Sequence, residues 1–346
     1  MKSKCLIVLV ALLVLGMAVQ TANTQTRKAG INSAAFLKVG VGARQVGLGS
    51  AVTSLTGDIN NMFWNPAGVA MRDQSLQASF THNNWIAGLE QEVAAVTYNM
   101  QDVGTIGVGV MMFGVSGIPA DRDYGYTDPQ LHAQEIDAVG TSTYDYQDLL
   151  LQATISRYIT DNLTLGVTAK YIHEKIDDQN ASAIAFDFGS VYNVGLLGWS
   201  IGARINNLGS DIKFYDYASP IPLTFSIGTS MVPIDVGKSQ VLLAVDLVKP
   251  QDGQQYYYSG AEFNYDKTLF IRLGWKFNYS YLGLIGDGID GGTSQRSPVQ
   301  TSLEKGSIGA GVRVPFEDYN ISFDYAYTVF QAVGAVHRFT VQFSMK

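Results

Sequence analysis

The sequence predicts an all-β protein, a closed 14-stranded antiparallel transmembrane β-barrel with an N-terminal luminal hatch that contains short helices. Three observations favour this class. Most of the chain after residue 75 alternates apolar and polar residues with a period of two, the connections between the alternating runs differ in length in a regular way, and the chain starts with an export signal. The composition agrees, because 15% charged residues, 36 Gly and 19 Tyr are unusual for a soluble enzyme and common in outer-membrane barrels.

Residues 1–22 have the pattern of a signal peptide. Lys2 and Lys4 precede an apolar run from Leu6 to Val19, which is too short to span a bilayer as a helix. The single cysteine, Cys5, would be removed with this signal, so the mature chain is expected to have neither a thiol nor a disulfide. The expected location is the outer membrane of a Gram-negative cell, with outer-membrane lipid as the first partner.

The next part of the chain, residues 23–74, does not alternate. Its apolar residues fit neither a strand nor a helix period, and its glycines allow backbone to pass close to other backbone. We therefore expect compact, irregular backbone with a short helix or two, packed inside a barrel formed by residues 75–346. The glycines in question are Gly40, Gly42, Gly47, Gly49, Gly57 and Gly68.

Fourteen runs with a period of two follow. In one of them, Leu163, Leu165 and Val167 share a face, while Thr164 and Thr168 share the other. The predicted strands are 75–82, 91–101, 104–116, 146–159, 162–176, 181–194, 198–208, 222–233, 239–249, 255–265, 267–278, 304–314, 318–329 and 336–346.

The connections after even-numbered strands are mostly short, whereas those after odd-numbered strands include two long ones, 117–145 and 279–303. This asymmetry is typical of an outer-membrane barrel with both termini in the periplasm. A soluble β protein is the alternative, because alternation alone does not say which face meets water. Aromatic residues near strand ends and the number of strands favour the membrane barrel, and a barrel of this size leaves a lumen to be filled.

We expect the polar faces of the strands to point into this lumen. Two interpretations of its charged residues stay open: wall charges that are solvated or bonded to the hatch backbone, and a charged track for a ligand. The predicted luminal charges are Lys170, Arg204, Asp246, Arg272, Lys276, Arg313, Asp324 and Arg338.

No catalytic or metal-binding motif is evident. The chain has no Gly-x-Ser-x-Gly elbow and no phosphate-binding glycine loop, its 4 histidines are scattered, and the acidic loops at 121–128 and 286–292 lack EF-hand spacing. We expect no enzyme activity, no metal and no cofactor. The net charge of -7 also argues against a nucleic-acid partner.

Three short pieces of the N-terminal region resemble the PorV/PorQ-like proteins, a branch of the FadL-like outer-membrane barrels. They are the run from Phe36 to Arg44, the run from Gly47 to Ala51, and Trp64-Asn65-Pro66-Ala67-Gly68. The resemblance implies a hatch in the lumen, with Asn65, Pro66 and Ala67 in the hatch. The hatch motif carried over from it comprises Gly40, Gly42, Arg44, Gly47, Gly49, Trp64, Asn65, Pro66, Ala67 and Gly68.

The resemblance implies one of two functions. The first is a component of type IX protein secretion, a cargo shuttle or accessory barrel whose partners are secreted proteins with C-terminal sorting domains and other secretion components. The alternative is a FadL-like transporter for long-chain fatty acids or other hydrophobic compounds. A purely structural surface barrel is a third class.

Overall fold

The computed structural model describes residues 31–120, 143–253, 255–278, 304–330 and 333–346. The predicted signal peptide, both acidic loops and most of the two long connections lie outside these residues.

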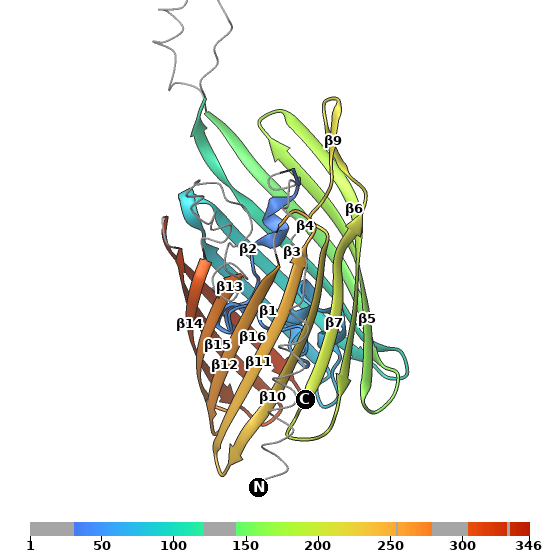
Figure 1. The fold of residues 1–346 in the computed structure, drawn as a ribbon, viewed down its shortest axis with the longest axis vertical. Helices are drawn as coiled ribbons and strands as arrows, with labels where there is room; N and C mark the ends of the chain where they lie inside the picture. Colours follow the sequence, from blue (N-terminus) through green and yellow to red (C-terminus); the bar gives the residue numbers. More distant parts are fainter. Residues whose placement is uncertain (1–30, 121–142, 254, 279–303, 331–332) are drawn as a thin grey trace, which may run out of the picture.

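Fourteen strands form one closed barrel in which every neighbouring pair is antiparallel (Figure 1). The predicted fold class is therefore confirmed, and each predicted strand matches an observed one to within a few residues. The barrel strands are β1 (Leu76–Asn84), β2 (Glu90–Met100), β3 (Gly104–Pro119), β4 (Thr143–Tyr158), β5 (Leu163–Ile176), β6 (Gln179–Asn193), β7 (Ser200–Gly209), β10 (Thr224–Val236), β11 (Ser239–Pro250), β12 (Tyr256–Tyr265), β13 (Leu269–Asn278), β14 (Glu304–Pro315), β15 (Tyr319–Phe330) and β16 (Gly334–Met345).

The seam between the first and last strands closes the barrel. β1 pairs with β16 over its whole length, from Leu76 opposite Met345 to Asn84 opposite His337. This closure pairs the backbone N–H and C=O groups that the edge strands of an open sheet would expose. None of the helices among the described residues is long and apolar enough to cross a membrane.

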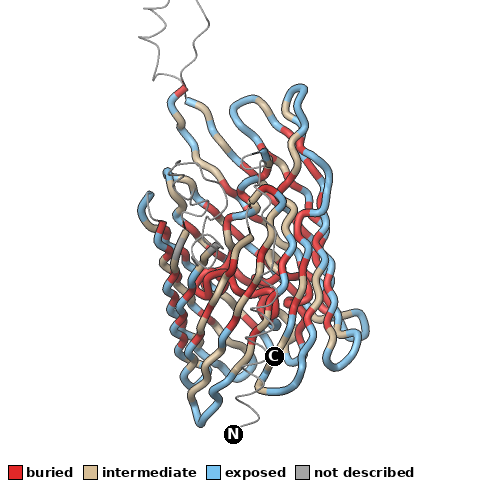
Figure 2. Tube along the Cα trace, in the orientation of Figure 1, coloured by how far each residue is buried: buried red, intermediate tan, exposed pale blue. Residues whose placement is uncertain are grey.

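Exposure alternates along the strands, as the alternating tube colours of Figure 2 show. In β5, Leu165, Val167 and Tyr171 point outward and are exposed, whereas Thr164 and Thr168 point inward and are buried. The outward row of β13, from Leu269 to Trp275, is apolar and about half exposed. An apolar outer surface of this kind is the lipid-facing band of a transmembrane barrel.

The two ends of the barrel differ. We call the end where β1 begins and β16 ends the turn end, and the opposite end the loop end. At the loop end, β3 to β6 rise above the other strands, and the connection after β7 carries a small hairpin of β8 (Ile212–Phe214) and β9 (Tyr217–Ser219) (Figure 1). The sequence did not predict this hairpin, because strands of three residues are too short to show a period.

The N-terminal segment, residues 31–75, lies inside the barrel and is largely buried (Figures 1 and 2). It begins near the loop end, where Ala34 N donates to Glu174 of β5 and Ser33 N donates to the carbonyl of Pro220. It ends at the turn end, where it continues into β1. Its short helices are η1 (Ala35–Lys38), α2 (Ala43–Gly47), η2 (Ile59–Phe63) and η3 (Pro66–Val69).

The expectation that polar faces line the lumen is wrong for one part of the wall. Near the loop end, several inward side chains of β2 to β5 are apolar, and they pack against the N-terminal segment at Phe36, Val39 and Val41. The sequence analysis expected the segment in the lumen, but it did not expect apolar wall side chains packed against it. The wall residues of this cluster include Val93, Met111, Phe113, Leu150 and Ile172.

Candidate functional site

The N-terminal segment packs against inward-facing glycines of the barrel wall. Cross-strand register places them side by side in pairs, with Gly166 opposite Gly189, Gly202 opposite Gly228 and Gly260 opposite Gly274. We call these six residues, which come from β5, β6, β7, β10, β12 and β13, the glycine girdle.

Backbone of the segment lies directly against the girdle. A methyl group added at Gly166 would overlap Pro66 and Ala67, and one added at Gly260 would overlap the carbonyl of Leu48. The segment needs glycine at Gly49, because its φ is 62° and a Cβ would lie 2.7 Å from the carbonyl of Ser259. Gly274 of the girdle faces it, and a Cβ there would lie 2.0 Å from Gly49 N. Sequence reasoning singled out the segment's glycines but missed those of the wall. The available signal was a glycine at an inward position of an alternating strand, which marks close backbone approach.

The residues from Trp64 to Gly68 form a corner fixed to the wall. Asn65 is extended, its Oδ1 accepts the N–H of Ala67 at 3.1 Å, and its Nδ2 donates to Thr53 O at 2.5 Å and Ser190 O at 3.3 Å. Pro66 then opens η3, where its missing N–H removes no helical hydrogen bond.

Three other glycines of the hatch motif occupy tight positions in the segment. Gly40 packs against the Trp64 ring, whose Nε1 donates to Val41 O at 2.9 Å, and Gly42 has a φ of 84°. Gly47 lies against Gly309 of the wall. The structure thus brings the motif residues together with the wall, within one compact body.

Arg44 connects the segment to the opposite wall. Its Nε and Nη2 each lie 3.0 Å from Glu262 of β12, and its Nη1 lies 3.2 Å from Asp58. Glu262 also accepts from Arg272 at 2.6 Å, and Arg272 reaches Asp324 at 2.5 Å. Burial disfavours the charged guanidinium of Arg44, but the two carboxylates outweigh this cost and raise its pKa above the ordinary value.

Asp246 of β11 binds the segment through hydrogen bonds alone. Its Oδ2 accepts the backbone N–H groups of Val52 and Thr53, each at 2.9 Å, and the Thr53 hydroxyl at 2.6 Å. Among the predicted luminal charges, Asp246, Arg272 and Asp324 therefore belong to contacts of the wall with the segment or with itself.

Three more of the predicted charges line the wall without a printed bond to the segment. Lys276 pairs with Glu304 at 2.6 Å, and the Nε of Arg313 donates to Ser322 at 3.2 Å. Arg338 is buried, and its Nε and Nη1 have no hydrogen-bond partner within the described parts of the chain.

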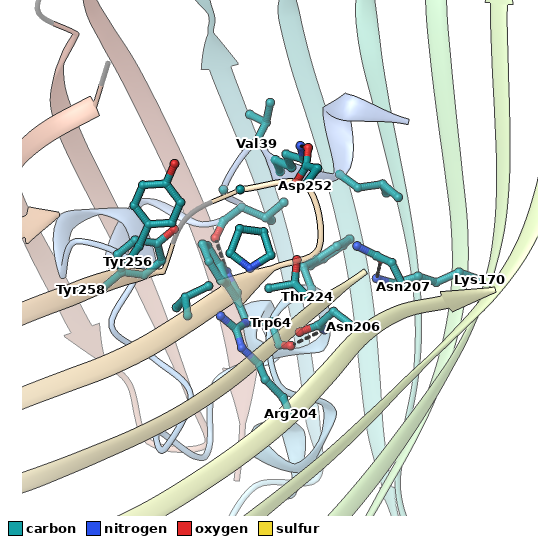
Figure 3. A pocket seen from close by; sticks show the side chains of 18 residues that line it. Val39, Trp64, Lys170, Arg204, Asn206, Asn207, Thr224, Asp252, Tyr256 and Tyr258 are labelled. Atoms are coloured by element: carbon teal, nitrogen blue, oxygen red, sulfur yellow. Dashed lines mark hydrogen bonds and ion pairs between the residues drawn. The ribbon is translucent and has the colours of Figure 1, made fainter. Parts of the chain in front are cut away.

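The two remaining charges, Lys170 and Arg204, line a pocket of about 400 Å³. It lies between the N-terminal segment and the loop-end half of the wall, bordered by β5, β7 and β10 to β12 (Figure 3). Its surface combines apolar side chains with a few polar groups, which is the usual make-up of a small-molecule site. Apolar and aromatic lining residues include Leu37, Val39, Trp64, Val248, Tyr256 and Tyr258.

A β-bulge shapes the polar side of the pocket. The register of β6 and β7 shifts between Phe186 and Phe188, so Asn206 and Asn207 both point inward, and Asn207 has a φ of 61°. Asp187 of β6 accepts from the Nδ2 of Asn206 at 2.9 Å, the N–H of Asn207 at 2.7 Å and Lys170 at 2.6 Å. These four polar residues, two of them charged, satisfy one another.

Arg204, the other predicted luminal charge of the pocket, is not satisfied in this way. It is 6% exposed, its guanidinium carbon lies 5.3 Å from the centre of the Trp64 ring, and its Nε has no hydrogen-bond partner among the residues that the structure describes. At the mouth of the pocket, Lys38 of the segment forms an ion pair with Asp252 of the β11–β12 connection. The described residues contain no cluster of three or more His, Cys, Asp or Glu that could hold a metal ion.

No protein-family model and no curated protein matches the chain. Several solved structures resemble it at low identity. The CymD monoaromatic hydrocarbon channel aligns with a TM-score of 0.57 and 11% identity over 89% of this chain and 98% of its own. The Ralstonia pickettii toluene transporter TbuX gives 0.54 and 12% identity over 89% and 98%, and the P. putida toluene transporter TodX gives 0.53 and 12% over the same shares.

At these identities the likeness establishes the fold. It covers nearly the full length of each channel, so the barrel and the segment inside it are compared as a whole. No comparison supports the assignment to the PorV/PorQ-like branch.

Proposed function

We propose that the protein is an outer-membrane channel through which small hydrophobic molecules enter the cell, and that these molecules bind in the pocket beside the N-terminal segment. The segment acts as the hatch of the barrel, and the role is non-catalytic. This is the alternative that the sequence analysis named beside protein secretion.

The pocket is the observation that best supports this proposal. A cavity of about 400 Å³, walled by Leu37, Val39 and Val248 and by the aromatic side chains of Phe63, Trp64, Tyr256 and Tyr258, lies between the segment and the wall toward the loop end. In a barrel whose fold is that of CymD, TbuX and TodX, this is a place for an apolar molecule to stop on its way through the lumen. The apolar outer face of the strands supports the membrane location.

Filling the pocket tests the proposal. Val248 is buried and lines the cavity, so Val248→Trp should occupy its volume with an indole ring. We expect uptake of radiolabelled toluene by cells that produce this variant to fall to the level of cells without the protein. The wild-type chain should raise uptake above that level.

Leu247→Trp is the matched control, since this residue directly precedes Val248 in β11 and points outward. It should leave toluene uptake unchanged, and both variants should show the heat-dependent gel shift of a folded barrel. If the wild-type protein gives no uptake of toluene or of octanoate above background, the channel proposal is wrong. Equal uptake by Val248→Trp and wild type would remove the pocket from the route.

A role in type IX secretion remains a hypothesis that rests on the N-terminal resemblance alone. Nothing in the geometry of the described residues favours it over the channel. Deletion of the gene separates the two: loss of surface proteins with C-terminal sorting domains would favour secretion, and an unchanged surface proteome with reduced hydrophobic uptake would favour the channel.

A further inference from the structure

Two buried carboxyl groups face each other near the loop end of the barrel, outside the pocket. The register of β4 and β5 places Asp148 directly opposite Glu174, and both lie at inward positions. Asp148 is fully buried, and Glu174 is 9% exposed. Opposite residues of an antiparallel pair have their Cβ atoms about 4.5–5.5 Å apart. The two acids therefore share one site.

No cation of the described residues neutralises this site. Neither acid has an ion-pair partner there, and the charge of Glu174 acts on Asp148 through space. The basic side chains in the loop-end half of the elements packed around the pair are engaged elsewhere or exposed: Lys170 pairs with Asp187, Lys38 pairs with Asp252, His173 bonds to Ser182 on the outer face, and Lys175 and Lys213 are exposed.

The surroundings of the pair are apolar. In register, Phe113 of β3 lies opposite Asp148, and Ala181 of β6 lies opposite Glu174. Phe113 and Ala181 belong to the apolar cluster that also contains Ala34 and Phe36 of the segment. Like charges repel strongly in such a site, so the two acids do not ionise together as readily as separate ones would.

One oxygen of Asp148 has no hydrogen-bond partner. Its Oδ2 accepts the hydroxyl of Tyr146, whereas its buried Oδ1 has no partner among the described residues. An anionic oxygen without a donor is costly in an apolar cluster. A proton on Asp148 removes this charge and provides an O–H donor beside the Glu174 carboxylate.

Glu174 connects the acid pair to the N-terminal segment. Its Oε1 accepts the N–H of Ala34 at 2.8 Å, and Ala34 has a φ of 52° directly before η1. The neighbouring Ser33 N–H bonds to the carbonyl of Pro220. A change of charge at the acid pair therefore acts on one of the few polar bonds that hold the start of the segment.

We propose that Asp148 and Glu174 form a proton-binding site that sets how firmly the start of the N-terminal segment is held. With one proton, carried by Asp148, the pair has a single negative charge and Glu174 binds the Ala34 N–H. When this proton leaves to water as the pH rises, the two anions repel each other, Glu174 turns away from Ala34, and residues 31–38 loosen. Resting on the proposed channel function, the proton also controls the border of the pocket at Leu37.

Infrared spectroscopy of the mature protein in lipid nanodiscs tests for the proton itself. A protonated carboxyl group has a C=O stretching band distinct from those of carboxylates. Wild type at neutral pH should show such a band that disappears at alkaline pH and is missing from Asp148→Asn. Asp145→Asn is the control, because it changes an exposed acid of the same strand and should keep the band. A wild-type spectrum without an Asp148-dependent band would overturn the proposal.

Hydrogen exchange, measured by NMR and corrected for the intrinsic rate at each pH, tests the hold on the segment. In wild type, protection of the Ala34 N–H should fall at least about tenfold between mildly acidic and alkaline pH, the size expected for loss of a hydrogen bond to a charged group. Asp148→Asn, which stays neutral, should keep its protection at both pH values, and Asp145→Asn should behave as wild type. Equal pH dependence in wild type and Asp148→Asn would overturn the proposal.

Two further results separate this inference from its alternatives. If calcium ions rather than a proton neutralised the pair, a chelator would loosen residues 34–38 of wild type at neutral pH, which would overturn the proposal. Normal toluene uptake with pH-independent protection of Ala34 would overturn this inference alone. Proton-dependent protection without any toluene or octanoate uptake would support the proton site and overturn the channel function alone.

Discussion

Two walls of the same lumen hold the N-terminal segment in different ways. Toward the loop end, β2 to β5 present apolar side chains to residues 34–41 of the segment. On the other side, the wall from β11 to β15 carries carboxylates and guanidinium groups. Its carboxylates bind residues 44–58 of the segment at Arg44, Val52 and Thr53. Apolar contact is non-directional, whereas a buried ion pair requires its geometry.

The difference identifies which part of the segment can adjust. The apolar wall tolerates small shifts of residues 34–41, and these residues border the pocket through Leu37 and Val39. The charged wall fixes residues 44–58, since each displaced group would leave a buried partner unsatisfied. Four predictions test this division, in order of decreasing effect.

Loss of charge at the fixed wall should have the largest effect. Glu262→Gln keeps the shape of the side chain but leaves the partly exposed Arg44 and the buried Arg272 without their shared carboxylate. We expect a loss of about 3–5 kcal/mol in the free energy of unfolding, because breaking a buried pair leaves an uncompensated charge. Denaturant unfolding in detergent micelles, followed by tryptophan fluorescence, measures it.

Asp266→Asn is the control for this variant, since it breaks the exposed pair of Lys238 and Asp266 at the turn end. Unfolding of this control should match wild type. A Glu262→Gln protein as stable as the control would show that the charged wall does not fix the segment.

Removal of an aromatic ring at the apolar wall should act more locally. Phe36 is buried and its ring stacks at 6.4 Å from that of Phe113 in β3. Phe36→Ala should cost about 3 kcal/mol for the contacts that it loses. Hydrogen exchange should rise in residues 34–41 and stay unchanged in residues 44–58.

Ile31→Ala, at an exposed position of the same segment, serves as the control and should change neither region. Faster exchange across the whole segment in Phe36→Ala would mean that the two parts act as one rigid unit.

Overpacking of the glycine girdle should displace the corner at Pro66. Gly166→Val introduces side-chain atoms where the backbone of Pro66 and Ala67 lies, and we expect a destabilisation of about 1–3 kcal/mol. Limited proteolysis should then cleave within residues 60–70. Ala169→Val adds volume on the outward face of the same strand and should leave the segment protected.

The ion pair at the pocket mouth should contribute least to stability. Lys38 is 43% exposed, so Lys38→Met should change the free energy of unfolding by less than about 1 kcal/mol. Salt should reduce even this difference. A shift in unfolding midpoint as large as that of Glu262→Gln would contradict the assignment of residues 34–41 to the adjustable part.

The strands could be predicted from the sequence because a period of two shows which residues share a face. The period does not show what lies opposite that face. Val93 and Ile172 are therefore apolar yet inward, since the segment rather than water covers them. The shared partners of Glu262, Arg44 and Arg272, lie more than 200 residues apart in sequence, and no local pattern links them.

The pocket could not be predicted from the sequence, because its polar side depends on a β-bulge that residue letters do not reveal. Asn206 and Asn207 face the same side only because the bulge opposite Asp187 interrupts the alternation. Lys170 and Arg204 were both expected in the lumen, but residue letters do not show that Lys170 pairs with Asp187, whereas Arg204 forms no ion pair among the described residues.

The seam between β1 and β16 has a consequence for biogenesis. Ala43 N donates to Thr340 Oγ1 at 2.8 Å, so the start of the chain and its final strand meet across 297 positions. A nascent polypeptide must have been delivered almost completely before this bond can form, and closing so long a loop makes folding slow. We therefore expect this contact, together with the pairing of β1 and β16, to be among the last interactions to form during assembly.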